Sequence, residues 1–243
     1  MASFLYDVGP DPIRADLVDA HRAAWAHIAA PGTWLTGPER VAVAKETRHA
    51  VGCRLCRERK AALSPVPVDG EHESGGGLPS AIVEQIHRIT TDAARLSERW
   101  YRSLLEDGLT PEAYVEALGV AVVTISIDRF HRALGLALEP LPEPLGGEPS
   151  RMRPNDVVEG EAWVPMRSAK AMAADAGLPL GQAPFVIRAL SLVPAEVRSW
   201  TRVSAAQYLA EQQIGRFEQV RAINRSQIEL VAGRVSALNE CFY

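Results

Sequence analysis

The chain has 243 residues, of which 47% are hydrophobic and 23% are charged, and its formal net charge is −4. This length and composition suffice for a buried core and exclude a disordered, collagenous or fibrous chain. The 26 basic and 30 acidic residues are scattered rather than grouped in blocks, so we expect no nucleic-acid partner and no anionic membrane surface as partner. Three cysteines in a chain of this length exclude a scaffold held together by disulfides.

The first twelve residues contain two aspartates and no basic segment, unlike a secretory signal peptide. The sequence also has no run of about 18 apolar residues, the length that a membrane-spanning helix needs. We therefore expect a soluble, cytoplasmic protein whose cysteines are available for thiol chemistry.

Apolar residues recur at helical spacing through most of the chain, and the alternation typical of strands is nearly absent. Helix starts are marked by Asp11-Pro12 and by Thr36 with Pro38. The most apolar segment, 115–136, predicts a central buried helix. We therefore predict an all-α fold, a bundle with helices at 11–30, 36–63, 79–89, 93–106, 110–136, 167–176, 183–193, 194–213 and 225–243.

Prolines and glycines prevent regular structure between 138 and 165. We predict a linker over 141–165 that joins a first helical unit (1–140) to a second one (166–243).

The two predicted units share a pattern around their cysteines. When Cys241 is laid on Cys53, the segment 225–232 falls on 37–44, and each segment precedes its cysteine by the same distance. We expect two related helical units that pack together, since each has more apolar surface than it can bury alone.

Cys53 and Cys56 form a Cys-X-X-Cys pair inside the predicted helix 36–63. One helical turn brings their Cα atoms within range of a disulfide, so the pair can cycle between dithiol and disulfide. His49 lies one turn before Cys53 and is the candidate proton acceptor. Positive charge stabilises the reactive thiolate. The basic residues near the pair are Arg54, Arg57, Arg59 and Lys60.

Two other interpretations of the cysteine pair stay open. The thiols can be buried as small apolar residues without chemistry. Alternatively, His49, Cys53 and Cys56 can bind zinc, but a closed site needs a fourth ligand, and the sequence has no second Cys-X-X-Cys or histidine pair. We therefore expect neither a metal nor another cofactor. His131 is the best single candidate for acid–base chemistry, and no pattern links the remaining histidines His21, His27, His72 and His87.

Glu229 lies twelve positions before Cys241 among apolar residues, where a carboxylate is costly unless it is paired or used. Glutamate, eleven residues, Cys-X-X-Cys, three residues and histidine is the pattern of the AhpD-like alkylhydroperoxidase and carboxymuconolactone decarboxylase superfamily. The segment 229–243 resembles its first two elements, and 86–140 resembles the continuation of its peroxidase-related members. The chain thus resembles a two-copy member of this superfamily over 36–140 and 185–243.

This resemblance implies a thiol-dependent peroxidase that reduces small hydroperoxides. In that superfamily the second cysteine of the pair attacks the peroxide, the first closes the disulfide, and a glutamate and a histidine relay protons. By analogy, Cys56 attacks and Cys53 resolves, while Glu229 is the relay acid of the second unit and Cys241 its resolving cysteine. A reductant protein or a small thiol regenerates the dithiol, and we expect a homo-oligomer by analogy alone.

The sequence departs from the superfamily pattern in both units. In the first, Val41 stands at the position of the relay glutamate and Lys60 at that of the histidine. In the second, the sequence ends at Tyr243, one residue before the expected attacking residue. We hypothesise that an in-frame UGA codon for selenocysteine has been read as a stop, because selenocysteine performs the same chemistry as a low-pKa thiol.

Two other functions stay open. One is a non-catalytic or degenerate helical protein whose cysteines are structural or sense the redox state, which the departures in the first unit favour. The other is acid–base chemistry of the carboxymuconolactone decarboxylase type, which uses histidines rather than thiols.

Overall fold

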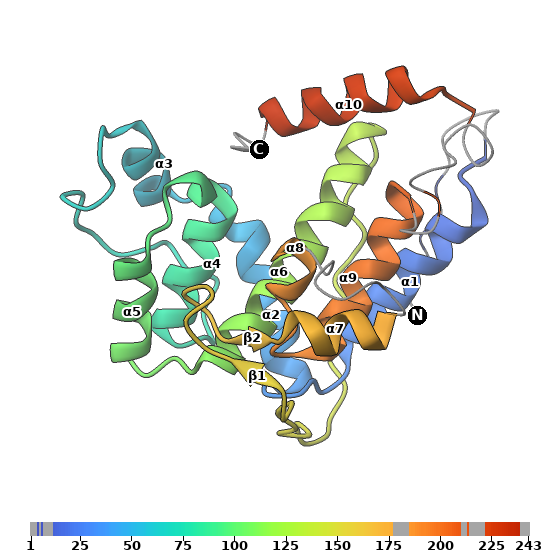
Figure 1. Ribbon diagram of the computed structural model, residues 1–243. Coiled ribbons are helices and arrows are strands. Elements are labelled where there is room, and N and C mark those ends of the chain that lie inside the picture. Colours follow the sequence, from blue (N-terminus) through green and yellow to red (C-terminus); the bar gives the residue numbers. More distant parts are fainter. Residues whose placement is uncertain are drawn as a thin grey trace.

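Helices make up nearly all the regular structure of the protein (Figure 1). The computed structural model describes residues 4, 6, 12–176, 185–209, 213 and 222–238. Within these residues the all-α prediction is confirmed, and the regular structure outside the helices is one two-stranded antiparallel sheet. The elements are α1 (Ala15–Ala29), α2 (Gly37–Ala50), α3 (Arg54–Ala61), α4 (Ser80–Asp92), the 3₁₀ turn η1 (Ala93–Arg95), α5 (Glu98–Glu106), α6 (Pro111–Ala133), β1 (Val157–Val158), β2 (Met166–Arg167), α7 (Ala169–Ala176), α8 (Phe185–Arg188), α9 (Pro194–Gln207) and α10 (Arg225–Leu238).

Side-chain caps begin several of these helices. Thr36 and Glu39 form a capping box at the start of α2, in which the Thr36 hydroxyl accepts from the Glu39 N–H at 3.4 Å. The Glu39 carboxylate in turn accepts from the Thr36 N–H at 2.7 Å. Ser97 and Thr110 cap α5 and α6 with their hydroxyl oxygens. Each cap satisfies a backbone N–H that the first helical turn leaves without a partner.

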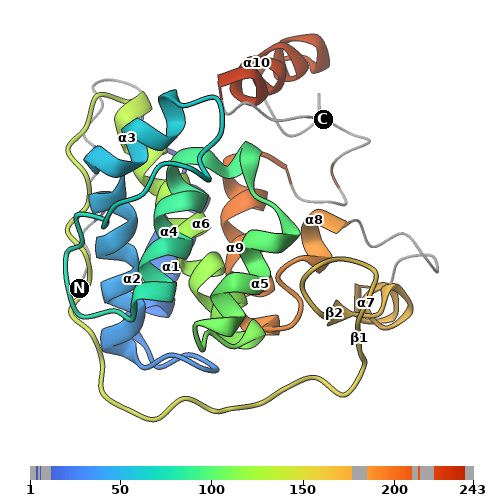
Figure 2. The same cartoon turned by 90° about the vertical axis from the view of Figure 1, so that its left-hand side faces the viewer.

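The long helix α6 is the centre of the bundle, as its apolar sequence predicts. It packs against α2, α4 and α9, and α1 packs against α2 and α9 (Figure 2). Val115 and Ile127 on α6 are fully buried. Leu192 and Val203 come from the second predicted unit and belong to the same hydrophobic core as α6. The two halves of the chain therefore share one core, and their kinship as related units stays a prediction.

The predicted helix 36–63 is wrong in one respect that decides where the cysteines lie. α2 ends at Ala50, a turn at Val51 and Gly52 follows, and α3 begins only at Arg54. Glycine is among the weakest helix formers, so Gly52 allows the break. Cys53 is the N-cap of α3 and has an extended backbone, with φ −62° and ψ 129°. The two thiols therefore lie at the first turn of a helix and not in its middle.

The proline-rich segment after α6 is bound to the surface of the bundle over part of its length. The Leu145 N–H donates to the Ala29 carbonyl at 2.8 Å, and the Arg151 N–H donates to the Thr33 carbonyl at 2.8 Å. Val157 and Val158, near the end of the predicted linker 141–165, form β1, which pairs with β2. The absence of helix in this segment agrees with the prediction, whereas the short sheet was not predicted.

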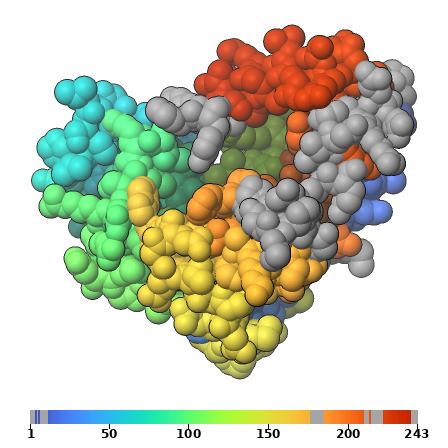
Figure 3. Space-filling view, viewed as in Figure 1, coloured from blue at the N-terminus to red at the C-terminus, as the bar shows by residue number. Residues whose placement is uncertain are grey.

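α10 lies at one end of the molecule, apart from the bundle, in both Figure 1 and Figure 2. Ile228 is the residue of this helix that is buried, whereas Leu230 and Leu238 are exposed. In the space-filling view the surface is hollowed between α10 and the side of the molecule that carries α3 and α4 (Figure 3). None of the helices described is both long and apolar enough to cross a membrane.

Candidate thiol centre

Two thiols and two imidazoles meet where α3, α4 and the loop between them come together. Cys53 and Cys56 lie at the start of α3, His72 lies on the loop 62–79, and His87 lies on α4. The Sγ atoms of Cys53 and Cys56 lie 3.6 Å and 3.5 Å from His72 Nδ1. Cys56 Sγ also lies 3.2 Å from His87 Nδ1. Each of these four residues offers one atom, and all four atoms lie within 4.8 Å of one another. We call this group the thiol–imidazole cluster.

A carboxylate holds each imidazole of the cluster from the opposite side of its ring. His87 Nε2 lies 2.8 Å from Glu46 Oε1, and His72 Nε2 lies 2.7 Å from Glu84 Oε2. Because each Nε2–H donates to a carboxylate, each ring turns its Nδ1 towards the sulfurs. The carboxylates therefore fix the orientation of both rings.

The two carboxylates are themselves held by further donors. Glu46 comes from α2, is 1% exposed, and accepts from the Gly75 N–H at 2.8 Å. Glu84 comes from α4 and accepts from Arg59 Nη1 at 2.8 Å and from Trp100 Nε1 at 3.0 Å. Burial raises the pKa of Glu84, but the hydrogen bonds from His72 and Arg59 outweigh it and lower the pKa to about 2. Glu84 is therefore ionised at neutral pH.

The two imidazoles differ in charge at neutral pH. Burial lowers the pKa of His72, but its hydrogen bonds to Cys56, Glu84 and Cys53 outweigh this effect and raise the pKa to about 10. The pKa of His87 is lowered, first by burial and also by the positive charge of His72, against the opposing hydrogen bond to Glu46. His72 is thus a cation and His87 a neutral base.

The thiol of Cys53 has a lowered pKa. Burial alone raises it, but the hydrogen bond with His72 and those from the backbone N–H groups of Cys56 and Glu73 outweigh the burial. The N-cap position adds to this effect, because the first turn of a helix carries partial positive charge. The cluster therefore places the Cys53 thiol, whose thiolate form is favoured, beside the His72 cation, and Cys56 beside its neutral partner His87.

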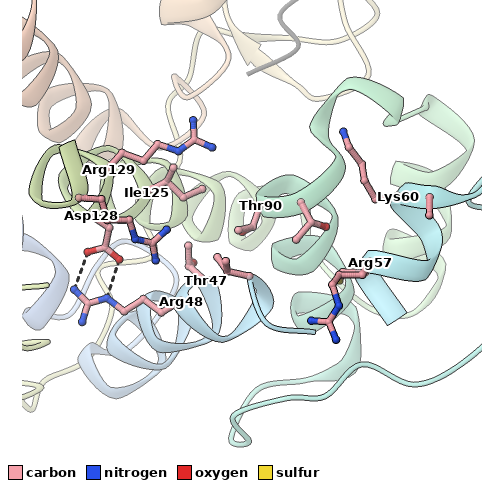
Figure 4. A pocket seen from close by; sticks show the side chains of 13 residues that line it. Thr47, Arg48, Arg57, Lys60, Thr90, Ile125, Asp128 and Arg129 are labelled. Carbon is pink, nitrogen blue, oxygen red and sulfur yellow. Dashed lines mark hydrogen bonds and ion pairs between the residues drawn. The ribbon is translucent and has the colours of Figure 1, made fainter. Parts of the chain in front are cut away.

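A cavity of about 470 Å³ reaches the cluster at Cys56. Side chains of α3 and α4 form one wall and those of α2 and α6 the other, as Figure 4 shows for Lys60, Thr90, Thr47 and Ile125. The lining is rich in basic residues. It contains the single carboxylate of Asp128 and the basic side chains of Arg48, Arg57, Lys60, Arg129 and Arg132.

Within this cavity the one carboxylate is already paired. Arg48 donates to both oxygens of Asp128, at 2.9 Å and 2.8 Å, which Figure 4 marks with dashed lines. The lining holds five basic side chains against this one carboxylate, although Lys60 also pairs with Asp92 at 3.8 Å, so positive charge predominates in the cavity.

Among the predicted site residues that the structure describes, Cys53 and Cys56 come together, whereas His49 and Glu229 do not join them. Cys53 and Cys56 are adjacent, as expected. His49 is exposed, and the imidazoles that reach the sulfurs belong to His72 and His87 instead. Only the charge of His49 acts on the cluster, where it lowers the pKa of His87.

The remaining predicted site residues belong to the second unit. Glu229 is exposed on α10 and forms an ion pair with Arg225 of the same helix at 3.7 Å. Cys241 lies outside the described residues. His131, the candidate for acid–base chemistry, is buried, and its Nδ1 donates to the Ile127 carbonyl at 2.9 Å. This hydrogen bond makes His131 a satisfied core histidine.

Two features near the cysteine pair were not predicted. A glutamate and a histidine, Glu46 and His87, lie beside Cys56, although Val41 and Lys60 stand at the positions where the superfamily pattern has them. The expectation that zinc lacks a fourth ligand is wrong, because His72 and His87 complete a set of four donors. The signal in the sequence is the spacing Cys-X₂-Cys-X₁₅-His-X₁₄-His, together with a glutamate seven residues before Cys53.

Searches with the full chain against protein-family models, curated proteins and solved structures found no match. The function of the thiol–imidazole cluster is therefore argued from its own geometry.

Proposed function

We propose that this protein reduces small organic hydroperoxides at Cys56 and stores the two oxidising equivalents as a Cys53–Cys56 disulfide. One observation carries the proposal: Cys56 Sγ lies 3.2 Å from His87 Nδ1, and Glu46 holds the other nitrogen of that ring. A nucleophile, a base within hydrogen-bond reach and a group that orients the base are the parts that thiol catalysis needs. The proposal agrees with the resemblance stated above, in which the second cysteine of the pair attacks.

In the first step, His87 Nδ1 takes the proton of the Cys56 thiol. The thiolate attacks the terminal oxygen of the hydroperoxide, the S–O bond forms and the O–O bond breaks. The alkoxide takes the proton from His87 and leaves as an alcohol, so that Cys56 becomes a sulfenic acid. Glu46 keeps the His87 ring in place while the ring is charged.

In the second step, the Cys53 thiolate attacks the sulfur of the Cys56 sulfenic acid. The S–S bond forms, the S–O bond breaks, and hydroxide leaves as water with a proton from His72. The net reaction converts two thiols and one hydroperoxide into one disulfide, one alcohol and one water. A dithiol protein or a small thiol then reduces the disulfide and closes the cycle.

The cavity at Cys56 supports a choice of substrate. Its volume of about 470 Å³ suits a small organic molecule, and Val51, Ala61 and Ile125 give it apolar surface. The predominance of positive charge in its lining favours a negatively charged group on the substrate. The preferred substrate class is therefore an organic hydroperoxide that carries a carboxylate.

The test measures peroxide consumption by the reduced protein with a dithiol reductant, in a Cys241→Ser background so that the third cysteine contributes nothing. Cys56→Ser should lose at least about 100-fold in rate. Without the reductant, Cys53→Ser should reduce about one equivalent of peroxide and then stop, with a sulfenic acid on Cys56 that dimedone traps. Equal consumption by the parent and by Cys56→Ser would remove Cys56 from the reaction.

A second candidate function is a non-catalytic protein whose cysteines stabilise α3. The burial of the two thiols favours it, since Cys53 is 0% and Cys56 2% exposed. In that case the reduced protein reacts with hydroperoxide no faster than free cysteine does, and both thiols resist alkylation until the protein unfolds. The rate of alkylation by iodoacetamide in the native state separates the two functions.

A further inference from the structure

We infer that Cys53, Cys56, His72 and His87 bind one Zn²⁺ ion in tetrahedral geometry. The inference concerns the same side chains as the proposed function but does not depend on it, because it requires ligand atoms and not a reaction with peroxide.

The donor atoms of the cluster have the spacing that tetrahedral zinc requires. Zinc bonds to sulfur at about 2.3 Å and to histidine nitrogen at about 2.0–2.1 Å, so a tetrahedral site sets its sulfur and nitrogen ligands about 3.6 Å apart. Three of the four sulfur–nitrogen distances in the cluster are 3.6 Å, 3.5 Å and 3.2 Å. All four donor atoms also lie within 4.8 Å of one another, as a common ligand requires. The cluster therefore needs only small movements to surround the ion.

On the side facing away from the sulfurs, each imidazole contacts a carboxylate. A histidine that binds zinc usually donates its other N–H to a carboxylate, which fixes the ring and makes it a better ligand. Both histidines have this partner, His87 in Glu46 at 2.8 Å and His72 in Glu84 at 2.7 Å. Each Nδ1 is thereby aimed at the sulfurs.

The chemistry of the donors selects the metal. Two thiolates and two neutral imidazoles are soft and intermediate ligands, which suit zinc and do not suit Mg²⁺ or Ca²⁺. Two thiolates also neutralise the charge of Zn²⁺, so the loaded centre fits a buried place such as that of Cys53 and Cys56. A set of four protein ligands forms a closed site, which is typical of zinc with a structural role.

The position of the ligands shows what the ion would hold together. Two ligands lie on the first turn of α3, one lies on the loop 62–79 and one lies on α4. This loop contains no helix or strand, and His72 is the member of the cluster that it carries. Zinc would therefore fasten α3 and the loop to α4, next to the cavity at Cys56.

The test titrates reduced, chelator-treated protein with Zn²⁺ in competition with a chromogenic chelator, and with Co²⁺ as a spectroscopic probe. One equivalent of each metal should bind, and Co²⁺ should give the sulfur charge-transfer and d–d bands of a tetrahedral site. Each of the four ligand variants should weaken binding strongly: Cys53→Ser, Cys56→Ser, His72→Ala and His87→Ala. The two serine variants should also weaken the sulfur charge-transfer bands of Co²⁺. Glu84→Gln should weaken binding by about 10- to 100-fold.

Two matched variants serve as controls. His49→Ala removes an exposed histidine that is not a ligand, and Cys241→Ser removes the third cysteine, so both should still bind one equivalent with the Co²⁺ bands of the parent. Metal binding that survives His72→Ala unchanged, or that disappears in Cys241→Ser, would overturn the inference. Circular dichroism of each metal-free variant checks the fold, and His72→Ala, on the loop, keeps the test valid where His87→Ala does not fold.

The outcomes separate this inference from the proposed function. Metal binding at one equivalent without peroxide consumption by the metal-free protein supports the zinc site and contradicts the peroxidase. Peroxide consumption that requires Cys56, without metal binding, supports the peroxidase and contradicts the zinc site. Where both occur, zinc-loaded protein should consume peroxide more slowly than metal-free protein, because the ion occupies the electron pairs of both thiolates.

Discussion

Arg40 on α2 donates through Nη1 to Glu196 on α9 at 2.8 Å, although 156 residues separate them in the chain. The same nitrogen contacts Glu116 on α6, and the side chains of all three residues are at most 1% exposed. His27 on α1 completes the group through its Nε2, 2.8 Å from Glu196 Oε1. One buried ion-pair network thus joins four helices of the bundle.

The first prediction concerns the loss of the cation from this network. Arg40→Met leaves Glu116 and Glu196 without their common partner in the core, and a buried charge without a partner is strongly destabilising. We expect the free energy of unfolding to fall by about 3–5 kcal/mol, measured by urea denaturation. Arg54→Ala is the control, because the Arg54–Glu58 pair is exposed and should contribute less than about 1 kcal/mol. A loss of similar size in both variants would contradict the role of the network.

The second prediction concerns the loop that precedes α2. A Cβ atom on Gly32 would lie 1.7 Å from Glu116 Oε1, a carboxylate that accepts from the N–H groups of Thr33 and Trp34. Gly32→Ala should therefore cost about 1–3 kcal/mol in the free energy of unfolding, because the core must shift to admit the methyl group. Gly233→Ala on α10 is the matched variant, since nothing lies within 4 Å of its Cβ position, and it should be neutral or slightly stabilising.

The third prediction separates the two carboxylates of the thiol centre. Glu46 orients His87, the proposed base, whereas Glu84 orients His72. Glu46→Gln should lower the rate of peroxide consumption by about tenfold or more, and Glu84→Gln should lower it less. Glu46→Asp should restore part of the rate lost in Glu46→Gln, at an unchanged thermal midpoint. A rate that follows the thermal midpoint of the variants would mean that Glu46 acts only on stability.

The fourth prediction concerns the charge of the cavity. Arg132 is exposed and lines the cavity at Cys56 without contacting the cluster. Arg132→Glu should raise KM for a hydroperoxide that carries a carboxylate by about 5- to 10-fold, because it replaces attraction by repulsion. KM for uncharged tert-butyl hydroperoxide should stay the same, and the difference should shrink as salt is added. Equal effects on both substrates would contradict selection by charge.

The fifth prediction is a pH dependence of stability caused by His21. This residue is buried, and burial, together with the charge of His131, lowers its pKa from 6.5 to about 4. Gln207 Nε2 lies 2.9 Å from His21 Nε2, and protonation of that nitrogen would remove this hydrogen bond. Between these two pKa values the unfolded chain binds more protons than the folded one, so stability falls as the pH falls.

The loss across the whole window is on the order of 3 kcal/mol, and about 2 kcal/mol of it should be visible in urea denaturation between about pH 7 and about pH 5. His21→Gln should reduce the slope of stability against pH, and the exposed His49 gives the control variant His49→Ala, which should retain it. The same slope in His21→Gln and in the parent would assign the pH dependence to other groups.

The helices could be predicted from the sequence because their signals are local. The caps at Thr36 and Thr110 and the apolar run of α6 determine those helices without help from the rest of the chain. The sequence does not predict the break between α2 and α3 at Gly52, because a single glycine within a helical pattern is tolerated as often as it ends a helix. The mistake placed the cysteine pair in the middle of a helix.

The site was harder to predict because its parts are not local. The cysteine pair is a short motif and could be recognised, but His72 and His87 join it through a loop whose path no local pattern specifies. Glu46 lies on α2, whose mostly polar sequence suggests an exposed charge at this position. Only the packing of α2 against α4 places Glu46 beside His87. His49 stands four residues before Cys53, the spacing expected of a proton acceptor, but its side chain is exposed.

The hydrogen bonds of Leu145 to the end of α1 and of Arg151 to the loop after it show that the proline-rich segment is not a free tether. A free tether would let the N-terminal and C-terminal halves swing independently. Here hydrogen bonds fix the segment to the outside of the bundle. Inside the bundle, the buried ion pairs of Arg40 with Glu116 and Glu196 join the two halves. Separating the halves would break the ion pair of Arg40 with Glu196, and the cavity at Cys56 does not lie between them, because its lining comes from the N-terminal half alone.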